Sequence, residues 1–159
     1  MKTLFLPTLA ALMLVTASCQ REAIGPCENV ACNAGYCDNG QCKCGQYHRG
    51  THCEEYIVDL ISGSWSSSEA CSISGTANNT VLISHSSASP TNNITIGPVR
   101  GLTMSANAIF HSINIPFQAS GQSTFSGSGT INQDLNSIDL QITVLTGFDE
   151  EACSVVLTR

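Results

Sequence analysis

The sequence predicts a small disulfide-rich module followed by an all-β antiparallel domain, with an export signal in front of both. Three observations lead to this fold class. Six cysteines lie within residues 27–53, apolar and polar residues alternate in many short segments after residue 93, and an apolar run occupies the start of the chain. A chain of 159 residues has room for one stapled module and one domain of about 100 residues.

The start of the chain has the layout of a signal peptide. Residues 4–15 form an apolar run behind the single basic residue Lys2, interrupted only by Pro7 and Thr8. A run of this length cannot cross a hydrocarbon core of roughly 30 Å as a permanent helix. We therefore expect residues 1–18 to be a signal peptide that is removed from the mature protein.

The number of cysteines sets Cys19 apart from the others. The chain has nine cysteines, so one is left over if the rest pair in an oxidising compartment. Cys19 follows the small residues at 16–18, and this arrangement resembles the lipobox of bacterial lipoproteins. The resemblance implies lipidation of Cys19, cleavage in front of it, and a lipid-anchored tether over residues 19–26. An ordinary signal peptide beside an unrelated cysteine is the alternative.

The residues after Cys19 bear on location. Gln20, Arg21 and Glu22 resemble the tag that directs some lipoproteins of Gram-negative bacteria to the outer leaflet of the outer membrane. The resemblance implies a protein of the cell envelope that is held on the outer membrane by its N-terminal lipid and exposed on the surface. Two or three acyl chains anchor a protein stably, because each buried methylene contributes about 0.8 kcal/mol.

The cysteine cluster has gaps of four, four, four, one and eight residues. Its last part, from Cys42 through Gly50 to Cys53, resembles the signature of EGF-like modules, which predicts such a module over residues 27–54. The resemblance implies one of the 15 possible pairings, with bridges Cys27–Cys37, Cys32–Cys42 and Cys44–Cys53. Crosslinks are needed here because so short a segment buries too little apolar surface to fold without them.

Two metal sites are alternatives for this segment. Zinc could use the cysteines together with His48 and His52, but an exported chain meets an oxidising compartment that favours disulfides. Calcium would need an acidic run before the first cysteine, and that run is absent. We expect no metal and no cofactor.

The composition shifts to Ser, Thr, Asn and Gly after residue 56, which places the second domain at 57–159 with hardly any linker. Turn-forming clusters lie near residues 87–93, 119–123, 133–136 and 147–151. Period-two alternation predicts strands at Ile94 and Ile96, and along the segments 102–110, 125–131, 138–144 and 153–157. We expect an antiparallel β-meander that either closes into a barrel or packs as a sandwich.

Two pairs of residues would close this domain. Cys71 and Cys153 are the cysteines left over, so we pair them across the first and last strands, where the bridge contributes on the order of 4 kcal/mol. The motif Gly63-Ser64-Trp65 resembles the Gly-x-Trp of lipocalins, which implies a lipocalin-like barrel with Arg159 stacked on Trp65. The alternative is that Trp65 is simply a core aromatic.

Groups suited to catalysis are scattered through the domain, and their spacing matches no known catalytic motif. They are His85, His111, Asp134, Asp139, Asp149, Glu150 and Glu151. The last three form an acidic run that is typical of a solvated turn, with a cation site as the alternative. Past Cys19, five basic residues oppose twelve acidic ones, and the resulting net charge of −7 argues against nucleic acid as a partner.

The sequence therefore predicts a non-enzymatic, lipid-anchored envelope protein that binds an unknown protein, glycan or small apolar ligand. In this hypothesis the EGF-like module is a spacer or contact surface. The main alternative is a lipocalin-like carrier, whose cavity would be lined by Phe110, Phe117 and Phe125. A hydrolase would need the scattered acids or histidines to converge, and a secreted eukaryotic ligand would carry glycans on Asn78 or Asn93.

Overall fold

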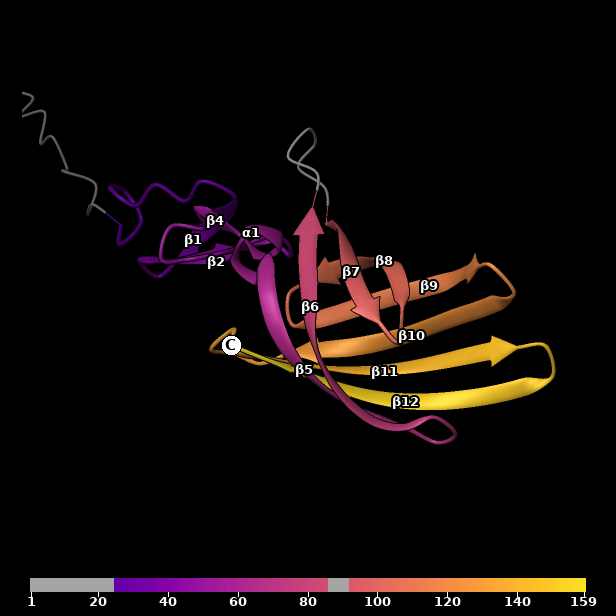
Figure 1. Cartoon of the computed structure of the whole chain (residues 1–159). Coiled ribbons are helices and arrows are strands. Elements are labelled where there is room, and N and C mark those ends of the chain that lie inside the picture. Colours follow the sequence, from indigo (N-terminus) through magenta and orange to yellow (C-terminus); the bar gives the residue numbers. More distant parts are fainter. Residues whose placement is uncertain (1–24, 86–91) are drawn as a thin grey trace, which may run out of the picture.

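The computed structural model describes residues 25–85 and 92–159. It has the predicted fold class: a disulfide-rich module comes first, and a closed, lipocalin-like barrel of eight antiparallel strands follows (Figure 1). The predicted signal peptide, Cys19 and the tether up to residue 24 lie outside the described residues. Most of the turn expected near residues 87–93 does so too.

Two short strand pairs shape the disulfide-rich module. They are β1 (Gly35–Asp38) with β2 (Gln41–Cys44), and β3 (His48–Arg49) with β4 (Glu55–Tyr56). The β1–β2 turn consists of Asn39 and Gly40, both with positive φ (49° and 84°), a conformation that an Asn-Gly pair adopts at little cost. Most of the module is exposed or half-buried, so crosslinks rather than a core hold it together.

Three disulfides provide those crosslinks: Cys27–Cys37, Cys32–Cys42 and Cys44–Cys53. This is the pairing that the resemblance to EGF-like modules implies. Cys37 and Cys42 face each other across the β1–β2 hairpin, so the first two bridges tie this hairpin to the segment before it. The third bridge ends at Cys53, which is only 1% exposed.

A short helix that the sequence pattern did not predict follows the module directly: α1 (Ile57–Ile61). Its apolar side chains Ile57, Val58 and Ile61 are all buried and belong to the core of the barrel. Five residues are too few to show a helical period, which explains why the alternation analysis missed the helix. The helix closes one end of the barrel like a plug.

The barrel strands are β5 (Gly63–Cys71), β6 (Gly75–His85), β7 (Asn93–Val99), β8 (Leu102–Ile109), β9 (Ser112–Ser120), β10 (Ser123–Ile131), β11 (Ser137–Thr146) and β12 (Asp149–Thr158). Each strand pairs with the next, and β12 pairs with β5 to close the meander. Cys71 and Cys153 face each other in this closing pair and form the fourth disulfide. The fold is therefore the barrel and not the sandwich.

Alternation along the strands fills the interior. On β5, Trp65, Ser67, Glu69 and Cys71 are buried, while the three residues between them are exposed. Strand β11 buries Ile138, Leu140 and Ile142 in the same way. Small eight-stranded barrels have room for little more than such side chains, and this core is packed accordingly.

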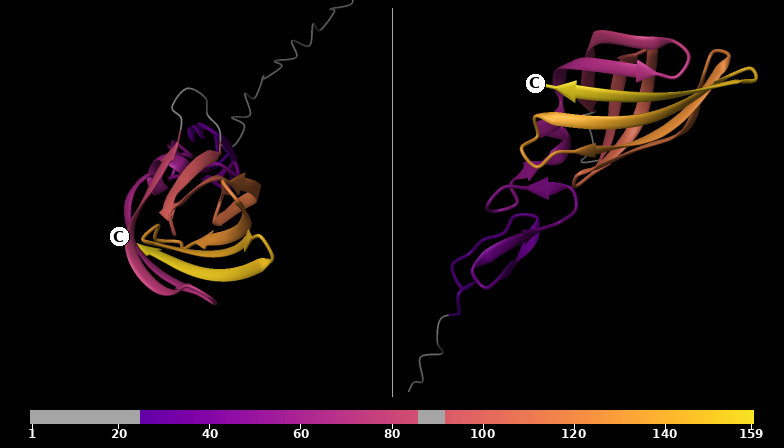
Figure 2. Two further views of the ribbon diagram at one scale, coloured as in Figure 1. Left: turned by 45° about the vertical axis from the view of Figure 1, so that its right-hand side comes forward. Right: turned by 90° about the horizontal axis from the view of Figure 1, so that it is seen from below.

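The barrel has two different ends. The proximal end faces the module and carries α1, the C-terminus and the turns at residues 110–111 and 132–136. The distal end carries the four hairpin turns at residues 72–74, 100–101, 121–122 and 147–148. Figure 2 shows the module and the barrel arranged end to end, with the distal turns furthest from the module. Within the described residues, no helix has the length and hydropathy needed to cross a membrane.

Candidate functional site

The expected stack of Arg159 on Trp65 closes the proximal end. The guanidinium carbon lies 4.1 Å from the centroid of the Trp65 ring. The same guanidinium donates hydrogen bonds to the carbonyls of Leu60 (2.9 Å) and Ser62 (2.7 Å), and the indole N–H of Trp65 donates to Ile61 (2.9 Å). These contacts join the end of the chain to α1 and β5, so the pair has a structural role.

The module and the barrel are also joined by hydrogen bonds to backbone carbonyls. The amide of Ile57 donates to the carbonyl of Tyr47, and the amide of Phe110 donates to that of Gln46, both at 3.0 Å. Arg49 donates to the carbonyl of Gln133 in the β10–β11 turn, also at 3.0 Å. Contacts from several loops at once hold the module against the proximal end.

The groups considered for catalysis occupy different parts of the barrel. His85 ends β6 and contacts Asp59 of α1 at 2.7 Å, and His111 in the β8–β9 turn lies 2.9 Å from the carbonyl of Ile131. Asp134 and Asp139 belong to the β10–β11 turn and to β11, whereas the acidic run starts β12 at the distal end. The structure does not bring these groups together.

Glu151, the last residue of the acidic run, organises the β5–β6 turn. Its carboxylate accepts hydrogen bonds from the hydroxyl and amide of Ser74, both at 2.6 Å, and from the amide of Ile73 at 3.3 Å. The hydroxyl of Ser74 is the largest cause that lowers the pKa of Glu151 below its ordinary value. The carboxylate also lies close to the sulfurs of Cys71 and Cys153, but these are bonded to each other and do not offer free thiolates.

The three phenylalanines expected around a ligand cavity do not share one. Phe125 is buried, but Phe110 lies in the β8–β9 turn and Phe117 is 74% exposed, so that expectation was wrong for both. Strand β9 is irregular where it pairs with β10 between Phe125 and Gly127, and this irregularity takes Phe117 out of the inward alternation. A cavity of about 10 Å³ lies inside the barrel near the distal end, which is about the space for one water molecule.

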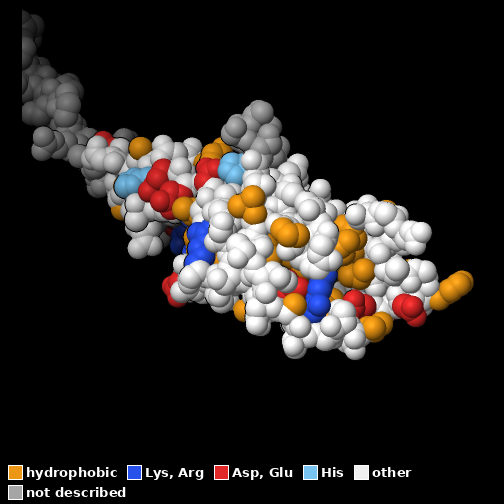
Figure 3. All heavy atoms as spheres, viewed as in Figure 1, with side chains coloured by type: hydrophobic (Ala, Val, Ile, Leu, Met, Phe, Trp, Pro, Cys, Tyr) orange, Lys and Arg blue, Asp and Glu red, His pale blue; other side chains and the backbone are white. Residues whose placement is uncertain are grey.

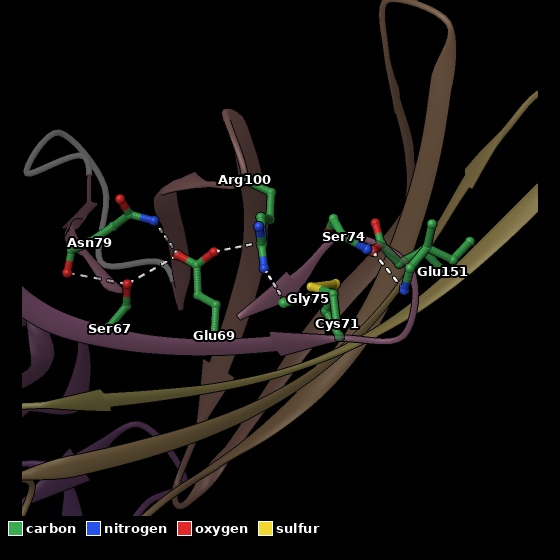
Figure 4. A network of polar contacts seen from close by, with 10 residues as sticks. Ser67, Glu69, Cys71, Ser74, Gly75, Asn79, Arg100 and Glu151 are labelled. Atoms are coloured by element: carbon green, nitrogen blue, oxygen red, sulfur yellow. Dashed lines mark hydrogen bonds and ion pairs between the residues drawn. A yellow bond between two sulfur atoms is a disulfide. The ribbon is translucent and has the colours of Figure 1, made fainter. Parts of the chain in front are cut away.

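A buried polar network, which the sequence analysis missed, lies beside this cavity (Figure 4). The side chain of Glu69 has no exposed surface, and its Oε2 atom lies 3.1 Å from Nε of Arg100. The amide of Asn79 donates to Oε1 at 3.1 Å, and the hydroxyl of Ser67 is placed to donate to it at the same distance. The sequence contained a signal for a buried Glu69. Its position alternates in register with those of Trp65 and Cys71, so the three side chains lie on the same face of the strand.

The comparisons with known proteins give no family. No family model matches this chain, and no curated protein matches it. Among solved structures, the chain is similar to a redesigned beta barrel at 13% sequence identity and a TM-score of 0.44, which covers 64% of this chain and 93% of that chain.

Large apolar side chains are exposed near the distal end. Ile73 lies in the β5–β6 turn, Phe148 in the β11–β12 turn, and Leu145 near the end of β11. Phe148 is fully exposed, and Ile73 is 65% exposed. Figure 3 shows hydrophobic side chains toward this end of the barrel, one group of them at its outermost tip. Isolated exposed apolar residues are common, but several at one end favour a contact surface.

A shallow groove of about 520 Å³ lies along β6, β5 and β12. It is lined by uncharged residues only, namely Ser66, Ser67, Ser68, Asn78, Asn79, Thr80, Val156 and Thr158. Hydroxyl and amide groups suit a neutral polar ligand such as a glycan, but this lining offers no aromatic ring for a sugar to stack on. The groove is therefore a weaker candidate than the distal end.

Proposed function

We propose that this protein is a non-enzymatic, lipid-anchored protein of the cell envelope that binds a partner through the distal end of its barrel. In this proposal residues 27–54 are an EGF-like module that serves as a spacer. Lipid on Cys19 attaches the chain to the outer membrane, and the module then holds the barrel away from the lipid surface.

The observation that carries this proposal is the opposite placement of the module and the exposed apolar residues. The chain reaches the barrel from the anchor side through the module, which contacts the proximal end by the three hydrogen bonds described above. Ile73 and Phe148 lie on turns of the distal end. Exposed apolar side chains on a surface that points away from the membrane are available to a soluble or neighbouring partner.

The anchor is tested by the intact mass of the protein extracted from membranes of a Gram-negative host. We expect a mature chain that begins at Cys19 with two or three acyl chains, and that gains eight hydrogens when its four disulfides are reduced. The control Cys19→Ser should stay in the soluble fraction or keep its signal peptide. An unacylated wild-type chain would contradict the proposal.

Binding through the distal end is tested by crosslinking on cells, with a photoreactive residue placed at Phe148 or at Leu82. Leu82 is a matched control, because it is also exposed but lies on an outer strand face away from the distal turns. We expect a specific crosslinked species from position 148 and none from position 82. Equal labelling at both positions would show that the distal end is not the contact surface.

The lipocalin-like carrier is the second candidate, and the barrel fold supports it. The cavity of about 10 Å³ is too small for a drug-sized apolar ligand, which needs roughly 300 Å³ or more. A carrier role therefore requires the distal end to open.

A further inference from the structure

The barrel wall has a gap between β6 and β7 in its distal half. Pairing of these strands covers only residues 82–85 of β6, so residues 75–81 lack a neighbour on that side. The β7–β8 turn, formed by Arg100 and Gly101, lies across this gap. Arg100 donates a hydrogen bond to the carbonyl of Gly75 and reaches inward to Glu69 (Figure 4). One side chain thus bridges a gap that backbone pairing leaves open.

The contact between Arg100 and Glu69 is incomplete. Nε of Arg100 lies 3.1 Å from Oε2 of Glu69, but its N–H is not aligned for a hydrogen bond. Neither atom has another hydrogen-bond partner among the described residues, and both atoms are buried. Arg100 therefore balances the charge of the carboxylate but leaves one of its oxygens without a well-aimed donor. Buried polar atoms are nearly always satisfied, so this oxygen marks a place for a better donor.

Arg100, which covers the carboxylate, lies beside an apolar space. The cavity of about 10 Å³ beside Arg100 is lined further by Val99, Leu102, Met104, Ile142, Val144 and Cys153. The side chain of Arg100 is 22% exposed, and it is held by a turn of two residues with positive φ rather than by a strand. If Arg100 swings out, the space of its side chain joins the cavity and opens to the solvent.

We propose that Glu69 is the anchor of a binding site for a small organic cation, an amine or guanidine with a short apolar stem, and that Arg100 is the built-in occupant that the ligand displaces. The ligand has to be cationic, because a buried carboxylate that loses Arg100 without replacement is strongly destabilised. The apolar stem fills the space of the Arg100 side chain against Val99 and Met104. This inference rests on the proposed binding role of the barrel and is independent of the lipid anchor.

The variant Arg100→Ala tests this proposal by emptying the site. N-ethylguanidinium has the atoms that this substitution removes, so it should bind there and raise the midpoint of thermal unfolding by about 5 °C at saturation. The matched control Arg49→Ala also loses one guanidinium that donates to a carbonyl, but at the module junction, and should show no rise. The double variant Arg100→Ala/Glu69→Gln should show none either, and butyrate should stabilise none of these proteins.

Three results would overturn the proposal: no rise of the unfolding midpoint in Arg100→Ala, an equal rise in either control protein, or a similar rise with butyrate.

The wild-type protein gives a second measurement, which also serves if Arg100→Ala does not fold. Titration with N-ethylguanidinium should shift the amide signals of Ser67, Gly75 and Asn79, with an affinity on the order of tenfold weaker than in the variant, because Arg100 competes. Absence of these shifts at tens of millimolar also refutes the site, whereas the crosslinking from position 148 stays an independent test of the distal surface.

Discussion

Arg159 shows how a single residue at the end of the chain stabilises the proximal end. It stacks on Trp65 and donates to two carbonyls at the C-terminal side of α1. Such a cation–π contact at an exposed position contributes about 0.5–1 kcal/mol, and a hydrogen bond from a charged donor contributes about as much or more. The resemblance to lipocalins identified both partners, but the two hydrogen bonds became apparent only in the structure.

We predict that Arg159→Ala lowers the free energy of unfolding by about 2 kcal/mol, because the stack and both hydrogen bonds are lost together. Denaturant unfolding followed by the fluorescence of Trp65, the only tryptophan, measures this change. Arg159→Lys keeps the charge but not the flat, forked guanidinium, so its free energy of unfolding should lie between those of the wild type and Arg159→Ala. A loss below about 0.5 kcal/mol in Arg159→Ala would mean that the contacts do not stabilise the fold.

Glu151 acts at the distal end in a similar way. Hydrogen bonds from Ser74 and Ile73 favour its charged form, and the pKa of Glu151 is therefore lowered. A carboxyl group with a lowered folded-state pKa adds stability above its unfolded pKa and loses this contribution as the pH falls through the folded value. The acidic run that the sequence presented as a solvated turn thus contains one residue with a defined structural role.

We predict that Glu151→Gln is less stable than the wild type at pH 7, and that the difference shrinks as the pH falls from about 5 toward 2. The midpoints of thermal unfolding of both proteins, measured across this pH range, give the difference in stability. Glu150→Gln is the matched control, because the neighbouring carboxyl of Glu150 accepts none of these hydrogen bonds. A constant difference over the whole range would contradict the assignment.

At the scale of elements, α1 links the module to the barrel core. Its three buried residues fill the proximal opening, and Trp65 donates to the helix from inside the barrel. The residue before the helix, Tyr56, ends β4, so the plug follows the module without any linker. This continuity agrees with the sharp change of composition after residue 56.

We predict that Ile61→Ala costs about 3 kcal/mol, because it removes a fully buried side chain and leaves a cavity under the plug. The same change at the exposed Ile73 should cost less than about 0.5 kcal/mol and serves as the matched control. Denaturant unfolding measures both variants. The shift of each midpoint is converted to a free energy with the same dependence on denaturant concentration. Equal costs at the two positions would show that α1 is not part of the core.

At the scale of the whole molecule, the module and the barrel are joined at several points rather than by one flexible connection. Hydrogen bonds reach from the module to the start of α1, to the β8–β9 turn and to the β10–β11 turn. A spacer that serves to present the distal end has to be stiff, so this junction matters for the proposed function.

We predict that the module and the barrel tumble as one body in solution. Amide relaxation measured by NMR should give the same rotational correlation time for residues 35–44 of the module and residues 137–158 of the barrel. A clearly shorter time for the module would show a flexible junction and would weaken its proposed role as a spacer.

Features that depend on spacing along the chain were predictable from the residues alone. Cysteine gaps gave the three bridges of the module through a family resemblance, and period-two alternation gave the meander, because strand geometry imposes that period locally. The bridge between Cys71 and Cys153 followed from counting, since no other pair remained.

The residues that meet inside the closed barrel were not predictable in this way. Closure of the barrel placed Glu69 of β5 opposite Arg100 of the β7–β8 turn, and no local sequence pattern relates these two positions. The irregular pairing of β9 and β10 exposed Phe117, and the turn before β9 took Phe110 away from the interior. These outcomes depend on the register of the barrel strands and on pairing between residues far apart in the chain. Alternation with a period of two predicts neither of these, because the period is interrupted wherever a strand bulges or ends.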